Sequence, residues 1–137
     1  MHFKYHSIVL LVMSLASNCF AAPDKVLYEL QEKCAKRMES VFKPEEKDVK
    51  GVITYSYFNH FSVTLNRCFV KEVMRIYPAN PSMTSVIHTI FDVNEGTEQA
   101  IFDKNPISGK VNACRVGEKL CSTEEAFEIG IKRFMEN

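Results

Sequence analysis

Residues 84–102 read TSVIHTIFDVNEGTEQAIF, and this stretch decides the fold. In an extended chain Thr84, Val86, His88 and Ile90 fall on one face and the residues between them on the other, so a strand is expected to run to about Val93. The run Asn-Glu-Gly-Thr that follows is typical of a tight reversal, after which Gln-Ala-Ile-Phe returns as a second strand. The stretch predicts an antiparallel hairpin.

Two further strands are predicted upstream, because residues 52–58 and 68–77 are rich in β-branched and aromatic side chains. Residues 59–62, Asn-His-Phe-Ser, have turn chemistry and predict a turn between these strands. The piece 63–67 is compatible with a strand or with a short helical turn. Residues 78–81 contain two prolines, which cannot donate to a sheet ladder, and they predict a turn before the hairpin.

Downstream of the hairpin, the segment 105–109 (Asn-Pro-Ile-Ser-Gly) interrupts the strand pattern and leaves 110–115 as a candidate fifth strand. A helix is expected to close the chain. Ser122 followed by Glu125 matches a capping box at its start. The apolar stripe expected to face inward consists of Phe127, Ile131 and Phe134.

A long amphipathic helix is predicted before the strands. Asp24 can cap its start, and Pro44 marks its end. Its apolar positions recur every three or four residues, at Leu27, Leu30, Cys34, Met38 and Val41. The order N-terminal helix, four- to five-stranded antiparallel sheet, C-terminal helix predicts an α+β fold in which one or both helices cover a face of the sheet.

The first 22 residues have the order of a cleavable secretory signal. Lys4 precedes the apolar run 8–13, and small residues precede Pro23. The run is shorter than the roughly 20 residues that span a bilayer, which disfavours an uncleaved anchor, and the residues before Cys19 do not match a lipoprotein signal. We therefore expect residues 1–22 to be removed and residues 23–137 to form a single domain.

The charges of the chain are nearly balanced. The whole chain has 17 basic and 17 acidic side chains, and removing Lys4 with the signal leaves one net negative charge. This balance gives no electrostatic reason to expect binding to nucleic acid or to an anionic membrane. No later segment is apolar and long enough to span a membrane, so none is expected in the mature chain.

Four cysteines remain after the signal, and an even number in a small exported domain favours two disulfides. We favour Cys114 with Cys121, because a four-residue loop over 116–119 would place them opposite each other in a non-hydrogen-bonded pair. This pairing leaves Cys34 with Cys68, a bridge that would tie the first helix to the sheet. Zinc binding is the competing use, but the chain has no Cys-x-x-Cys motif.

A spaced pattern over most of the mature chain resembles a set of small exported bacterial proteins of uncharacterised function. The matching stretches are residues 27–37, 58–61, 65–70 and 91–96. Members of that set often carry tyrosine and lysines where this chain has residues 61–64, so the chain departs from them there. The resemblance implies bacterial export and one shared fold, and it implies no reaction.

Catalysis by an imidazole would have to use His60 or His88, the histidines that follow the signal. His60 is the better candidate because it falls in a predicted turn, whereas His88 is expected to be a sheet-surface or hydrogen-bonded core residue. Neither has a metal-ligand partner at a recognised spacing, and no Gly-x-Ser-x-Gly motif occurs. Residues 92–96 lack the ligands of a calcium loop. We expect no metal site and no cofactor.

Aromatic side chains are concentrated on the first two predicted strands, and alternation sends them to both faces of the sheet. If the helices leave one face uncovered, some of these side chains would form an exposed contact patch; burial under a helix or in a homodimer would explain the same residues. The residues expected to bind a partner are Tyr55, Tyr57, Asn59, His60, Phe61 and Asn66.

The sequence therefore predicts a periplasmic or secreted, non-enzymatic protein that binds a protein or a small ligand. Two alternatives stay open. One is a small envelope hydrolase that uses His60 with an acidic residue brought close by the fold. The other is an oligomeric structural component of the envelope.

Overall fold

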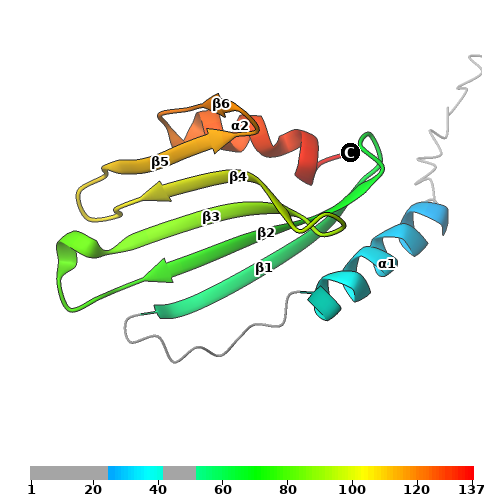
Figure 1. Ribbon diagram of the computed structural model, residues 1–137, viewed down its shortest axis with the longest axis horizontal. Coiled ribbons are helices and arrows are strands. Elements are labelled where there is room, and N and C mark those ends of the chain that lie inside the picture. The colour runs from blue at the N-terminus through cyan, green and yellow to red at the C-terminus, as the bar shows by residue number, and fades with distance from the viewer. Residues whose placement is uncertain (1–24, 42–51) are drawn as a thin grey trace, which may run out of the picture.

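The structure is a computed structural model that describes residues 25–41 and 52–137. The predicted signal, the cap at Asp24 and the helix end at Pro44 lie outside the described residues. Within the described residues, two α-helices, six strands and a short 3-10 helix follow one another (Figure 1). In chain order they are α1 (Lys25–Val41), β1 (Val52–Ser62), β2 (Arg67–Ile76), the 3-10 helix (Pro81–Met83), β3 (Ser85–Asp92), β4 (Thr97–Lys104), β5 (Val111–Val116), β6 (Lys119–Leu120) and α2 (Glu124–Met135).

The strands form one antiparallel sheet in the order β1-β2-β3-β4-β5-β6, so each strand lies beside its neighbour in sequence. The α+β class and the antiparallel sheet are confirmed. The number of strands is six and not four to five. The additional strand is β6, which has two residues and is too short to show a hydropathy period.

The turn predicted at residues 59–62 is wrong, because these residues are the last part of β1. Ser62 pairs with Arg67, and the chain reverses over residues 63–66. Asn66 has a positive φ of 51°, a conformation that asparagine tolerates better than most residues, and its N–H donates to the Val63 carbonyl at 3.2 Å. Val63 and Leu65 are apolar, so this part of the sequence lacks the polar composition by which turns are usually recognised.

The β5–β6 hairpin carries the predicted bridge between Cys114 and Cys121, whose Cα atoms are 4.9 Å apart. Val116 pairs with Lys119, so the loop has two residues, and Gly117 takes the positive φ of 59° that glycine adopts without penalty. The Cys121 N–H donates to the Cys114 carbonyl at 3.0 Å. The cysteines therefore occupy a hydrogen-bonded position and not the non-hydrogen-bonded pair that we expected.

The two helices cover opposite faces of the sheet. The cluster under α1 contains Cys68 and Val70 of β2, whereas the cluster under α2 contains Phe69 between them. Adjacent residues of a strand point to opposite faces, so each helix packs on its own face. In Figure 1, α1 lies beside the end of β1 and β2, away from β4 and β5.

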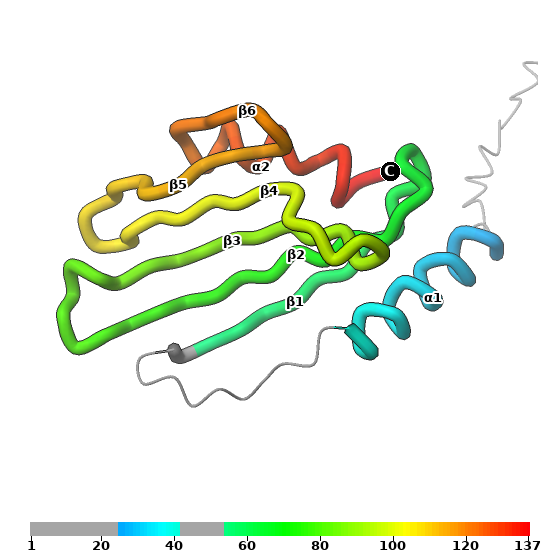
Figure 2. The backbone as a smooth tube through the Cα atoms, viewed as in Figure 1, coloured from blue at the N-terminus to red at the C-terminus, as the bar shows by residue number. Residues whose placement is uncertain are grey.

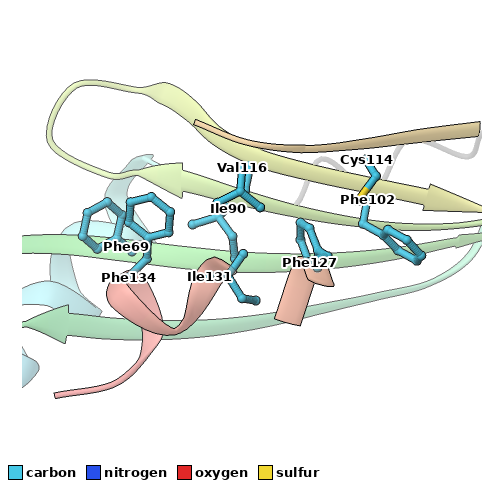
Figure 3. Packing of buried hydrophobic residues seen from close by; sticks show 9 residues of the cluster. Phe69, Ile90, Phe102, Cys114, Val116, Phe127, Ile131 and Phe134 are labelled. Carbon is cyan, nitrogen blue, oxygen red and sulfur yellow. The ribbon is translucent and has the colours of Figure 1, made fainter. Parts of the chain in front are cut away.

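The larger core lies between the sheet and α2. Figure 3 shows the α2 side chains Phe127, Ile131 and Phe134 directed at the strands, and all three are buried, as predicted. The side chains they meet come from the four central strands: Phe69, Ile90, Ala100, Phe102, Cys114 and Val116. Because this face is packed along most of its width, we regard it as the main source of stability.

The smaller core under α1 is built around the second disulfide. Cys34 and Cys68, with Cα atoms 5.4 Å apart, form the bridge predicted to tie the helix to the sheet. Both are buried, 3% and 4% exposed, together with Phe61, Val70 and Val93. The bridge therefore lies beneath the helix and not in solvent.

The start of α2 differs by one residue from the prediction. The N-cap is Thr123, whose Oγ1 accepts a hydrogen bond from the Ala126 N–H at 3.1 Å, and Ser122 precedes it. Serine and threonine are both favourable N-cap residues, so residue preference alone could not show which of the two caps the helix. Glu124 and Glu125 lie in the first turn, where their negative charge suits the helix dipole.

The β1–β2 and β3–β4 turns lie at the same end of the sheet (Figure 2). Asp92, which is fully buried, joins them: its Oδ2 accepts from Arg67 Nη1 at 2.8 Å. Its Oδ1 accepts from the backbone N–H groups of Asn94 at 2.8 Å and Glu95 at 3.2 Å. These hydrogen bonds hold the β3–β4 turn in place. Residues 92–96 therefore form a hairpin turn, as the sequence predicts.

Candidate functional site

The α1 face of the sheet has a part that no described helix covers. Pairing registers place Tyr57, Glu72, Thr89 and Ile101 in one row across β1 to β4, and Tyr55, Met74, Ile87 and Asp103 in the next row. Thr89 is buried, and Asp103 accepts a hydrogen bond from Ser85 Oγ. We use the name open face for the other six side chains of these rows. They are Tyr55, Tyr57, Glu72, Met74, Ile87 and Ile101.

The open face results from the position of α1. This helix packs on β1 and β2 around Phe61, Cys68 and Val70, with Tyr57 at the border of this core. Among the described residues its main contacts are with β1 and β2, so the part of the face toward β3 and β4 is the least covered. The six side chains are half-buried, except Tyr55, which is 37% exposed. Five of them are aromatic or aliphatic, so the surface is mostly apolar.

The edge of the open face carries a pair of aromatic rings. Tyr55 and Tyr57 are two residues apart on β1 and therefore share a face. Their ring centroids are 6.2 Å apart and their planes differ by 4°, so the rings are stacked. Stacked, rigid tyrosines offer contact area with little loss of side-chain entropy on binding.

Glu72 is the acidic group of the open face. Burial raises the pKa of its carboxyl group, and a hydrogen bond with Tyr57 acts in the opposite direction. Burial also raises the pKa of Tyr57, and the charge of Glu72 adds to this effect. The carboxyl group is therefore partly removed from water and interacts with Tyr57.

Two of the predicted binding residues lie under α1 and not on the open face. Asn59 Oδ1 accepts a hydrogen bond from Gln31 Nε2 at 2.6 Å. Phe61 is 8% exposed and belongs to the core around the Cys34–Cys68 bridge. Their role is to hold α1 against the sheet.

His60 and Asn66 are also separated from the open face. His60 pairs with Phe69 and points to the α2 face, where its Nε2 is buried without a hydrogen-bond partner among the described residues. Asn66 serves the β1–β2 turn. Of the six predicted residues the structure brings Tyr55 and Tyr57 together, and it gives His60 no hydrogen-bonded carboxylate in the described part of the chain.

His88, which we expect to be a sheet-surface or a hydrogen-bonded core residue, is half-buried, and its Nδ1 has no hydrogen-bond partner among the described residues. It lies between the rings of Phe102 and Phe127, at centroid distances of 6.0 and 6.1 Å. Its Nδ1 is buried and 3.6 Å from Glu128 Oε1, beyond hydrogen-bond distance, while Lys71 Nζ binds the same oxygen at 2.8 Å. Burial, and then the charge of Lys71, lower the pKa of His88.

A separate groove of about 610 Å³ lies between the β5–β6 hairpin and α2. Val116, Leu120 and Ala126 give it apolar walls, and Arg133 lies at its side. The guanidinium of Arg133 is 4.5 Å from the centre of the Phe134 ring, which holds it in place. The groove belongs to the α2 side of the molecule and does not connect with the open face.

The residues that sequence reasoning missed are Glu72, Met74, Ile87 and Ile101. Each occupies an alternate position of a predicted strand, so the face of each strand could be read from the sequence. Which of the two faces would remain uncovered depends on where the helices pack, and no local pattern specifies this.

The described residues contain no group of three or more His, Cys, Asp or Glu side chains placed to hold a metal ion. Their helices also include none that is long and apolar enough to cross a membrane. The two disulfides are compatible with an oxidising environment outside the cytoplasm. Comparisons with protein-family models, with curated proteins and with solved structures found no match for this chain.

Proposed function

We propose that the protein is exported to the periplasm or the extracellular space and acts there by binding another protein through the open face. The observation that carries the proposal is an apolar surface that no described helix covers, on a disulfide-bonded sheet. Apolar surface without a covering element is typical of contact sites in small proteins. The signal-like residues at the start of the sequence support the location.

A protein is a better match for this surface than a small molecule. The two rows cross four strands, which at about 4.8 Å between strands makes a surface roughly 15 Å across before the side chains are added. Aromatic side chains and methionine, which the open face contains, are enriched at the centre of protein interfaces. The tyrosine pair would provide the main apolar contact and Glu72 the orientation.

Site-specific photo-crosslinking tests the proposal. A photoreactive residue at Ile101, within the open face, is expected to form a defined adduct in cells that export the full chain. The matched control is Ile129, which is 61% exposed on α2 and lies on the other side of the sheet. An adduct at Ile101 that is absent at Ile129 supports the open face, whereas equal labelling at both positions, or none at Ile101, contradicts it.

A further inference from the structure

β1 is an edge strand of the sheet. It pairs with β2 on one side, and the described part of the chain has no strand on its other side. Natural proteins protect such edges with charged residues, prolines, bulges or a covering element, because an open edge can accept another strand. The described residues protect β1 along only part of its length.

The protection comes from α1. Gln31 Oε1 accepts a hydrogen bond from the Phe61 N–H at 2.7 Å, and Gln31 Nε2 lies 3.3 Å from the Asn59 carbonyl. These bonds show that the odd-numbered residues of β1 direct their backbone groups away from β2. By alternation Tyr55 and Tyr57 direct theirs outward as well, and the contacts of the described residues include no partner for these groups.

The sequence at the unprotected part of the edge lacks charge. Residues 54–58 read Thr-Tyr-Ser-Tyr-Phe, with neither a charged residue nor a proline. Phe58 is 56% exposed although it is a large apolar side chain in the middle of a strand. The bulge that protects many edges lies before this segment, between Val52 and Thr54.

We propose that β1 pairs with β1 of a second copy of this chain, antiparallel, about a two-fold axis at Ser56. In this register Tyr55 of each copy lies opposite Tyr57 of the other, and both pairs exchange N–H···O bonds through their outward backbone groups. Ser56 lies opposite its own counterpart in a non-hydrogen-bonded pair. The result is one continuous sheet through both copies.

The side chains favour a second copy over an unrelated strand. On the α1 face, each tyrosine pair extends the existing Tyr55–Tyr57 stack across the axis, and such aromatic cross-strand pairs are stabilising. On the α2 face, Thr54 lies opposite Phe58 of the second copy and gives that exposed ring a neighbour. No like charges meet across the axis, because the segment has none.

The position of α1 sets the register. Asn59 and Phe61 are already bonded to Gln31, so the new ladder is confined to residues 54–58. If one strand were shifted by one residue relative to the other, each tyrosine would lie opposite a residue whose side chain belongs to the other face of the sheet. The two-fold axis at Ser56 is the centre of the available segment.

Cysteine substitution tests the register. Ser56→Cys is expected to form an intermolecular disulfide under mild oxidation, because opposed residues in a non-hydrogen-bonded pair have Cα atoms about 4.5 Å apart. Thr54→Cys is the control: its copy lies four residues along the antiparallel strand, at roughly 13 Å, and is out of reach. Peptide mapping of both variants confirms that the bridges Cys34–Cys68 and Cys114–Cys121 are retained.

Equilibrium sedimentation of the unmodified chain provides a second measurement. The mass is expected to rise with concentration from one copy to two, and Tyr55→Lys is expected to weaken association at least 10-fold. Tyr77→Lys is the matched control, since Tyr77 is 43% exposed and lies beyond the end of β2. A constant single-copy mass, or crosslinking of Thr54→Cys as efficient as that of Ser56→Cys, overturns the proposal.

The proposal goes beyond the binding function and can fail separately from it. Ser56 points to the α2 face, so Ser56→Cys leaves the open face unchanged. Loss of the Ile101 adduct with retained pairing contradicts the binding function alone, and the reverse result contradicts the pairing alone.

Discussion

Glu72 has a pKa raised mainly by burial, and this fixes the direction of its effect on stability. The folded chain holds the Glu72 proton more tightly than the unfolded chain, so this group favours folding when protonated and loses that contribution as pH rises through its folded pKa. A carboxylate kept in such a position at the expense of stability is typical of a site that serves binding.

Glu72→Gln is therefore expected to raise the melting temperature at pH 7, because the amide has no charge to desolvate and its oxygen can still accept from Tyr57. The difference from the unmodified chain is expected to narrow at pH 4, where the carboxyl group itself is neutral. Thermal melts at the two pH values measure this. A variant that melts lower at pH 7 would show that the charge stabilises the fold.

His88 acts in the opposite direction to Glu72. Burial lowers its pKa from 6.5, so the folded chain favours the neutral imidazole and the unfolded chain takes up the proton first. The contribution of neutral His88 to the free energy of unfolding is fully present above about pH 6.5, and it is lost as pH falls from there toward the folded pKa.

His88→Gln removes this contribution to the pH dependence. The stability advantage of the unmodified chain over the variant is expected to be larger at pH 7.5 than at pH 5.5. Urea titrations at both pH values give the comparison. An advantage that stays constant or grows on acidification would mean that Lys71 and Glu128 rearrange to accommodate the charged ring.

The strands and the last helix are the elements that could be predicted best, because alternation along a strand and the stripe of Phe127, Ile131 and Phe134 follow from side-chain burial alone. The β1–β2 turn could not be predicted. Asn59 and Ser62 are frequent turn residues, but here pairing with β2 keeps both extended. The open face could be predicted only in part, since Tyr55 and Tyr57 belong to one strand while Glu72 and Ile101 join them through pairing.

The contact of α2 with β5 depends on a glycine. A Cβ at Gly130 would lie 3.0 Å from Val116 Cγ2 and 3.2 Å from its Cγ1. Gly130→Ala is expected to destabilise the fold by about 1 kcal/mol, because overpacking of about 1–3 kcal/mol exceeds the gain of about 1 kcal/mol in helix propensity. Urea denaturation measures the change.

A double-mutant cycle with Val116→Ala provides the control for this contact. The smaller side chain makes room for the new methyl group, so the two substitutions together are expected to cost at least about 0.5 kcal/mol less than the sum of their separate effects. Strict additivity would place the cause of the Gly130→Ala effect outside this contact.

The two disulfides constrain very different lengths of chain. Cys34–Cys68 spans 34 residues and Cys114–Cys121 spans 7. In the chain-entropy model, replacing both cysteines of the long bridge by alanine is expected to cost about 4 kcal/mol, and replacing both of the short bridge about 2 kcal/mol. Denaturation of the two double variants measures the difference.

Hydrogen exchange distinguishes what each bridge holds. Without Cys34–Cys68 the amides of α1 are expected to exchange much faster than those of α2, since the α1 core is the smaller of the two. Uniform acceleration over both helices would instead indicate that the sheet depends on the bridge as a whole.

The hydrogen bonds from Gln31 to β1 have a consequence for the order of maturation. They depend on α1 lying against the sheet, and the Cys34–Cys68 bridge holds it there. In the pairing that we propose, a chain that oxidises first meets its copy with a short exposed segment and one register for pairing. A chain that meets its copy first exposes a longer edge, through Phe61, and has several registers available, which favours misassembly before the bridge has formed.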